Sequence, residues 1–181
     1  MNENLDMQKH LFLTGKRGIG KSTIISWVIS QISVKISGFK TVYIPELNGD
    51  SNLYLLDADN SLNMCASDYN KIAHKSPETK IEIYPDKFIS VGIPLLQKSL
   101  NSKLIIMDEL GWIESSCTEF QNSVLSILNN DVPVIGVIRD THTPFLDAIR
   151  CHPNVSILNV TTQNREYLRE KVLQHIQDNE K

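Results

Sequence analysis

Apolar runs alternate with amphipathic stretches along the chain. This alternation is typical of a parallel β-sheet covered by helices. Short buried strands are predicted at His10–Thr14 and Lys40–Ile44, and further strands at Lys103–Gly111, 132–140 and 154–160. We therefore expect an α/β fold with about five parallel strands between two layers of helices.

The segments between these strands show helical periodicity. A helix is predicted after the first strand, and Gly38 would end it. Its apolar face would consist of Ile25, Val28, Ile29, Ile32 and Ile36. Ser116 and Glu119 have the spacing of a capping box and predict the start of a later helix.

Residues 45–84 interrupt the alternation. Asn48-Gly49 is a strong hairpin signal, and it lies between segments of strand character. Pro45 beside it favours an edge position, because proline cannot donate to a β-ladder. The sequence therefore predicts an antiparallel β-hairpin inserted into the parallel sheet.

Length and charge narrow the class of protein. A chain of 181 residues with 41% hydrophobic content is expected to form a single domain spanning residues 1–181. A net charge of −3 disfavours a protein whose main partner is nucleic acid, although a local basic patch stays open. No segment is apolar enough to span a membrane, and three widely spaced cysteines without a CxxC pair favour a cytoplasmic protein.

The segment LFLTGKRGIGKSTII contains the pattern Gly-x-x-x-x-Gly-Lys-Ser between an apolar strand and an amphipathic helix. Glycines let successive backbone N–H groups point at phosphate oxygens, and the lysine reaches the β- and γ-phosphates. The predicted nucleotide-binding residues of this loop are Gly15, Lys16, Arg17, Gly18, Ile19, Gly20, Lys21, Ser22 and Thr23. Lys16 and Arg17 can add positive potential near the phosphates, and the alternative is that their side chains are only solvated.

Two carboxylates end the strand at Lys103–Gly111. Asp108 is expected to hold Mg²⁺ together with the Ser22 hydroxyl. Glu109 can deprotonate a water for attack on the γ-phosphate, and with Lys21 it forms the predicted catalytic pair. The alternatives are a turn-capping role for Asp108 and a structural salt bridge for Glu109.

Few arginines are placed to meet phosphate charge. Residues 85–138 contain none, so the arginine-rich lid of a small nucleotide kinase is missing and water is favoured as the acceptor. Arg139 follows a buried strand and is a candidate to contact the γ-phosphate, with a surface pair to Asp140 as the alternative. Asn164 and Arg165 open the last helix, where Arg165 can approach the base or remain exposed.

Five segments of the chain are LFLTGKRGIGKSTII, GFKT, IIMDELGWIE, VPVIGVIRD and NVTTQNREYL. They occur in the order found in the small cancer-related nucleoside-triphosphatase family of archaea, bacteria and animals, and the chain resembles this family from about residue 10 to residue 175. The resemblance implies a RecA-like or AAA-like P-loop fold and Mg²⁺-dependent removal of the γ-phosphate from several nucleoside triphosphates. It also implies phosphate binding by residues 15–23, with Asn164 and Arg165 at the family's Asn-Arg pair.

Two positions depart from the family pattern. Trp112 stands where the family usually has lysine, and the GFKT segment lacks the family's arginine. These departures bear on the rate of hydrolysis and the choice of nucleotide. The sequence leaves open a nucleoside or nucleotide kinase with an acceptor pocket under residues 45–84, and a nucleotide-binding switch with little turnover. It also leaves open the preferred base and the oligomeric state.

Overall fold

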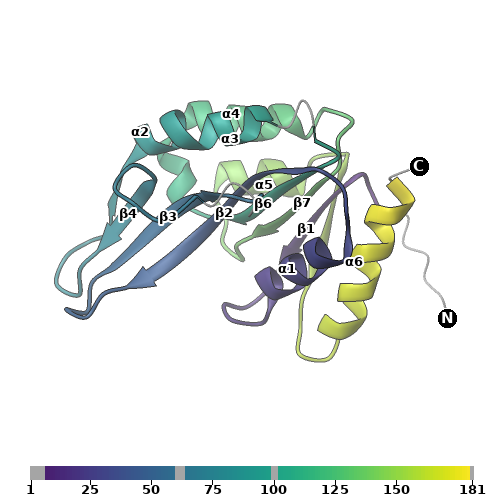
Figure 1. Cartoon of the computed structure of the whole chain (residues 1–181), viewed down its shortest axis with the longest axis horizontal. Coiled ribbons are helices and arrows are strands. Elements are labelled where there is room, and N and C mark those ends of the chain that lie inside the picture. The colour runs from purple at the N-terminus through teal and green to yellow at the C-terminus, as the bar shows by residue number, and fades with distance from the viewer. Residues whose placement is uncertain (1–6, 60–63, 99–101, 180–181) are drawn as a thin grey trace.

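The computed structural model describes residues 7–59, 64–98 and 102–179. These residues form an eight-stranded sheet with the order β5-β4-β3-β2-β6-β7-β1-β8 (Figure 1). Its parallel part consists of β2 (Ile36–Pro45), β6 (Leu104–Leu110), β7 (Val134–Ile138), β1 (His10–Thr14) and β8 (Val155–Asn159). The predicted set of five parallel strands is confirmed.

Helices cover both faces of the sheet, so the fold has three layers (Figure 1). One face carries α1 (Lys21–Gln31) and α6 (Arg165–Asn179). The other face carries α2 (Pro85–Lys87), the π-helical turn η2 (Phe88–Gly92), α3 (Ile93–Gln97), α4 (Thr118–Ile127) and α5 (Pro144–Arg150). The 3₁₀ turn η4 (Ile113–Ser116) joins β6 to α4. None of the helices among the described residues has the length and apolarity that a bilayer span requires.

The strand side chains divide into two cores by alternation. In β1, Leu11 and Leu13 pack on the side of α1 and α6, whereas Phe12 packs on the opposite side. β6 repeats this division, because Ile106 joins the first core and Met107 the second. Side chains of a strand alternate between faces, so a central strand must be apolar at nearly every position. This explains the continuous apolar runs in the sequence.

The predicted hairpin is present, and it is the first part of a larger structure. β2 turns at Gly49, whose φ is +87°, into the antiparallel strand β3 (Ser51–Asp57). β4 (Lys71–Lys75) and β5 (Glu82–Ile83) then add to the sheet edge, again antiparallel. We call β3, β4, β5 and their connecting loops the antiparallel extension. Pro45 pairs only with β3, because the pairing of β2 with β6 ends at Lys40.

The first helix is shorter than the sequence pattern suggests. α1 ends at Gln31, and both Ile36 and Gly38 belong to β2. Gly38 has a φ of +102°, and a Cβ atom at this position would lie 2.0 Å from the carbonyl oxygen of Ile106. The glycine therefore permits close approach of two strands and does not stop a helix.

The capping box predicted from Ser116 and Glu119 is also wrong. Cys117 occupies the N-cap position of α4, and its side chain makes no capping hydrogen bond. The Ser116 hydroxyl instead donates to the carbonyl oxygen of Ile113, 2.8 Å away, within η4. The 3₁₀ turn thus uses the serine that the pattern assigned to the helix.

Replacing Gly38 with alanine is expected to lower the free energy of unfolding by about 3 kcal/mol or more, because strain at positive φ adds to a backbone clash. Gly49→Ala is the matched control. Its φ is also positive, but the nearest obstacle is the Pro77 ring at 3.2 Å, so we expect a loss of about 1–2 kcal/mol. Urea unfolding of both variants measures the difference. Equal losses would contradict the strand-contact role of Gly38.

Candidate functional site

The candidate site lies at the edge of the sheet where the parallel strands end. The loop after β1, the carboxylates at the end of β6 and Arg139 after β7 all emerge there, because these three strands are adjacent and parallel. This edge is where α/β sheets place ligand sites. The fold therefore brings together the residues that the sequence singled out in three separate segments.

The loop between β1 and α1 curls tightly. Gly15, Gly18 and Gly20 all have positive φ, and Gly20 precedes the first residue of α1. A Cβ atom on Gly15 would lie 2.6 Å from the carbonyl oxygen of Val160, so this position accepts no side chain. The curl leaves the N-terminal end of α1 at the sheet edge, and such helix ends attract anions through their free N–H groups and dipole.

Lys21 is held inside this loop. Its ammonium donates to the carbonyl oxygen of Gly15 at 2.8 Å and to that of Lys16 at 3.0 Å. The residue is only 7% exposed. These two hydrogen bonds fix the ammonium of Lys21, and its positive charge, beside the backbone of the loop.

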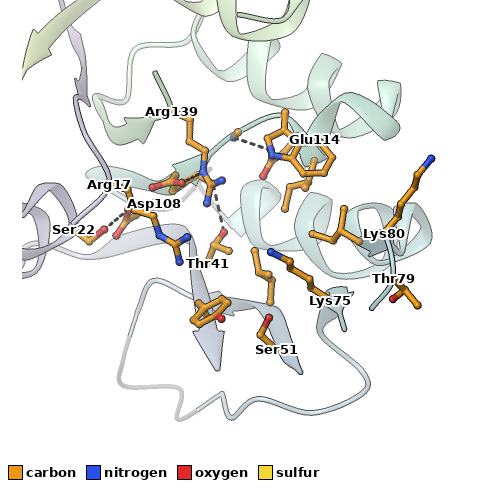
Figure 2. Close-up of a pocket in the computed structure, with 17 residues that line it drawn as sticks. Arg17, Ser22, Thr41, Ser51, Lys75, Thr79, Lys80, Asp108, Glu114 and Arg139 are labelled. Carbon is orange, nitrogen blue, oxygen red and sulfur yellow. Dashed lines mark hydrogen bonds and ion pairs between the residues drawn. The ribbon is translucent and has the colours of Figure 1, made fainter. Parts of the chain in front are cut away.

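Ser22 joins the loop to β6. Its hydroxyl donates to Oδ1 of Asp108 at 2.9 Å (Figure 2). Burial raises the pKa of Asp108 to about 6, and the hydrogen bond from Ser22 partly opposes this rise. The site thus contains a buried carboxylate whose charge is incompletely compensated by the protein.

Glu109 forms an ion pair with Arg139, through Oε1 and Nε. The alternative pairing of Arg139 with Asp140 is not the one observed. The backbone carbonyl of Glu109 also accepts a hydrogen bond from the Thr41 hydroxyl at 3.4 Å. Arg150 supports this corner, since its guanidinium donates to the carbonyl oxygen of Arg139 at 2.7 Å. Arg139 is therefore held beside Glu109 from both its side chain and its backbone.

Glu114 is a buried carboxyl that the sequence pattern did not assign to the site. It lies in η4, is 1% exposed, and accepts the backbone N–H of Gly111 at 2.8 Å. Burial raises its pKa to about 7, and the nearby Arg139 partly opposes the rise. An acid in a short turn gives no local signal of such burial, because the burial depends on packing of the turn against β6 and α4.

A cavity of about 580 Å³ opens beside these groups (Figure 2). Of the predicted site residues, Arg17, Ser22, Asp108, Glu109 and Arg139 line it. The remaining lining residues are Thr41, Tyr43, Ser51, Leu53, Lys75, Thr79, Lys80, Ile81, Gly111, Trp112, Ile113 and Glu114. The antiparallel extension and the end of β2 thus supply much of the wall, which the sequence indicated only as a possible pocket under residues 45–84.

The other predicted residues lie around the loop and outside this cavity. Gly18, Lys16 and Thr23 are exposed, and Ile19 is half-buried. The guanidinium of Arg17, at the cavity wall, lies 5.6 Å from the centre of the Tyr43 ring.

Asn164 and Arg165 lie at the turn between β8 and α6. The Asn164 amide donates to the carbonyl oxygen of Asn159 at 2.9 Å and accepts the N–H of Thr161 at 2.7 Å. The guanidinium of Arg165 lies 3.5 Å from the carboxylate of Glu166. Asn164 shapes the turn, which adjoins the loop because Val160 contacts Gly15.

Comparison with known proteins decides the family. The sequence model of a family described as NTPase matches residues 10–173. The chain belongs to this NTPase family. The resemblance to the cancer-related nucleoside-triphosphatases is thereby confirmed.

Two curated relatives illustrate the match. The nucleoside-triphosphatase THEP1 of Aquifex aeolicus is 24% identical over 174 residues, covering 90% of this chain and 96% of its own. The cancer-related nucleoside-triphosphatase homolog of Mus musculus is 26% identical over 189 residues, covering 94% of this chain and 98% of its own.

Solved structures agree on the fold. The crystal structure of THEP1 from Aquifex aeolicus superposes with a TM-score of 0.72 at 19% identity, covering 92% of this chain and 98% of that chain. The solution structure of a human cancer-related nucleoside triphosphatase gives 0.67 at 20% identity, covering 93% and 97%. The predicted P-loop fold is confirmed.

The buried acid Glu114 predicts a pH dependence of stability. Its pKa rises on folding from 4.5 to about 7. Between these pH values the folded state still holds a proton that the unfolded chain has already lost. Stability from this group is present at low pH and declines as pH rises through that window, by up to about 3 kcal/mol. Glu114→Gln removes the decline, so the variant should gain stability relative to the parent between pH 5 and pH 8.

Urea unfolding of the parent and of Glu114→Gln at pH 5 and at pH 8 tests this expected gain in stability. Glu119→Gln, a change of the same type on the exposed side of α4, is the control and should leave the pH dependence unchanged. A parent–variant difference for Glu114→Gln that is constant from pH 5 to pH 8 would show that Glu114 titrates normally.

Proposed function

We propose that this protein hydrolyses the γ-phosphate of nucleoside triphosphates in a Mg²⁺-dependent reaction, NTP + H₂O → NDP + phosphate. The observation that carries the proposal is the hydrogen bond between Asp108 and Ser22 of the loop, with Glu109 beside Asp108 at the wall of the same cavity. Membership of the NTPase family supports it, as do the names of the relatives.

The loop would bind the phosphates. Residues 15–23 offer backbone N–H groups at the N-terminus of α1, and Lys21 adds a fixed positive charge. These groups would contact only the phosphates, which all nucleoside triphosphates share. Weak discrimination between bases is therefore expected. Asn164 and Arg165, in the turn beside Gly15, would be the residues that contact the base.

The residues present fit a magnesium ion. The Ser22 hydroxyl oxygen and Oδ1 of Asp108 are 2.9 Å apart at the cavity wall, and Mg²⁺ in nucleotide sites takes one or two protein oxygens with phosphates and waters. Burial of Asp108 disfavours its charge, and a divalent cation would compensate for that cost. When bound, the ion would neutralise charge on the β- and γ-phosphates.

Glu109 would act as the general base, and Arg139 would control it. In the structure the Arg139 guanidinium pairs with the Glu109 carboxylate. An anionic γ-phosphate at this end of the cavity would compete for that guanidinium. Glu109 would then be released to accept a proton from a water, while Arg139 meets the charge that develops on the phosphate.

Glu109→Gln tests the base. The amide keeps the size and hydrogen-bonding reach of the side chain but cannot accept a proton, so phosphate release should fall by roughly 10²- to 10⁴-fold. Affinity for ATP should change little, because binding rests on the loop, Lys21 and the metal. Glu119→Gln, an acid on the exposed side of α4, is the matched control. Loss of rate and affinity together would make Glu109 a structural brace, and an unchanged rate would exclude it as the base.

Asp108→Asn and Ser22→Ala test the metal site. Both variants should need a higher Mg²⁺ concentration for half-maximal phosphate release, because each removes an oxygen ligand or its charge. Asp140→Asn removes a charge from an exposed position one residue after Arg139 and is the control. Magnesium titrations that coincide for the parent and the two site variants would place the metal elsewhere.

A further inference from the structure

The cavity extends well beyond the loop. Its volume of about 580 Å³ lies within the range of small-molecule ligand sites. Of residues 15–23, only Arg17 and Ser22 line it. A nucleotide seated on the loop would therefore place its terminal phosphate at one end of the cavity, and most of the space would remain open.

Strand register shows how far the open space reaches. Asp108 pairs with Lys40 of β2, and β2 continues five residues further to Pro45. Pro45 pairs with Ser51, which in turn pairs with Lys75 of β4. Three strand spacings, roughly 14 Å across the sheet, separate β4 from β6. Lys75 therefore lies at the end of the cavity opposite the terminal phosphate.

The far end carries the exposed cation of Lys75. The ammonium of Lys75 points into the cavity, whereas that of Lys80 points away from it (Figure 2). Among the described residues, Lys75 makes no ion pair or hydrogen bond through its side chain. The cavity's carboxyls, at Asp108, Glu109 and Glu114, are each already paired or hydrogen-bonded at the other end. An unpaired ammonium that faces a cavity attracts an anion.

Two exposed aromatic residues line the same cavity. Tyr43 is 51% exposed and Trp112 is 39% exposed, although both carry large apolar rings. Aromatic faces at the wall of a site offer stacking surfaces for planar rings, and nucleobases stack on them regardless of base identity. Thr41 and Ser51, which carry hydroxyls, also line the cavity, and the Thr41 hydroxyl donates to the carbonyl oxygen of Glu109.

We propose that this cavity binds a second ligand, a nucleoside monophosphate, with its phosphate at Lys75 and its base against Tyr43 and Trp112. The inference rests on the proposed position of the triphosphate at the loop and extends beyond hydrolysis. The second ligand occupies the space between Lys75 and the terminal phosphate, so the protein holds two nucleotides at once.

A binding titration tests this. The loop is first filled with saturating ADP and Mg²⁺, and AMP, GMP, CMP and UMP are then titrated separately by calorimetry. At least one monophosphate should bind, and adenosine and inorganic phosphate should each bind more weakly than AMP. Lys75→Ala should weaken monophosphate binding by about tenfold or more, because a charge-assisted contact is lost. Lys80→Ala, the matched control, should change it by less than about twofold.

The remaining outcomes overturn the inference. These are absence of monophosphate binding to the ADP-loaded parent, equal effects of the two lysine variants, and displacement of ADP by the monophosphate. Binding of a short oligouridylate but of no monophosphate would also overturn it. Phosphate release from ATP alone is measured in parallel on the parent. If the parent releases none, the proposed hydrolysis fails, whereas the titration still reports on the second ligand.

Discussion

The hydrogen bond from Ser22 to Asp108 joins the first turn of α1 to the end of β6, and the geometry of the site depends on it. β7 lies between β1 and β6 in the sheet, so the loop after β1 must reach across one strand to meet this carboxylate. The contact fixes the loop relative to Glu109, the next residue. Burial destabilises the charge of Asp108, and one hydroxyl only partly compensates for it. In the proposed reaction, the bound metal would compensate the negative charge of Asp108 that the protein leaves only partly balanced.

The parts of the fold with strong local signals could be predicted from the sequence. Buried parallel strands are apolar at nearly every position, and the phosphate loop is a continuous motif, so neither depends on distant residues. The site residues at strand ends followed from the same pattern, because adjacent parallel strands end at one edge. Arg139 was placed at that edge, but its partner was not predicted. Pairing with Glu109 depends on the register of β6 and β7, in which the alignment shifts between Asp108 and Leu110.

The features that the sequence did not predict correctly share a physical cause. A local sequence pattern is compatible with several structures, and contacts with distant residues select one of them. A glycine after an apolar periodic segment fits a helix end, yet Gly38 serves a strand contact with Ile106. Ser116 has the spacing of a capping box, yet its hydroxyl bonds within a 3₁₀ turn. Glu114 is buried by tertiary packing, which no neighbouring residue in the sequence indicates. In each case a contact between distant segments overrides the local preference.

The length of β2 relative to β6 links the fold to the proposed chemistry. Beyond Lys40, β2 pairs with β3 and no longer with β6, and this half of β2 together with the antiparallel extension forms one side of the cavity wall. A general base acts on whichever hydroxyl lies within hydrogen-bonding reach, so Glu109 alone does not select between water and another acceptor. In the proposed site, that selection belongs to the walls, where residues of β2, β3 and β4 together with Trp112 would hold or exclude a second molecule.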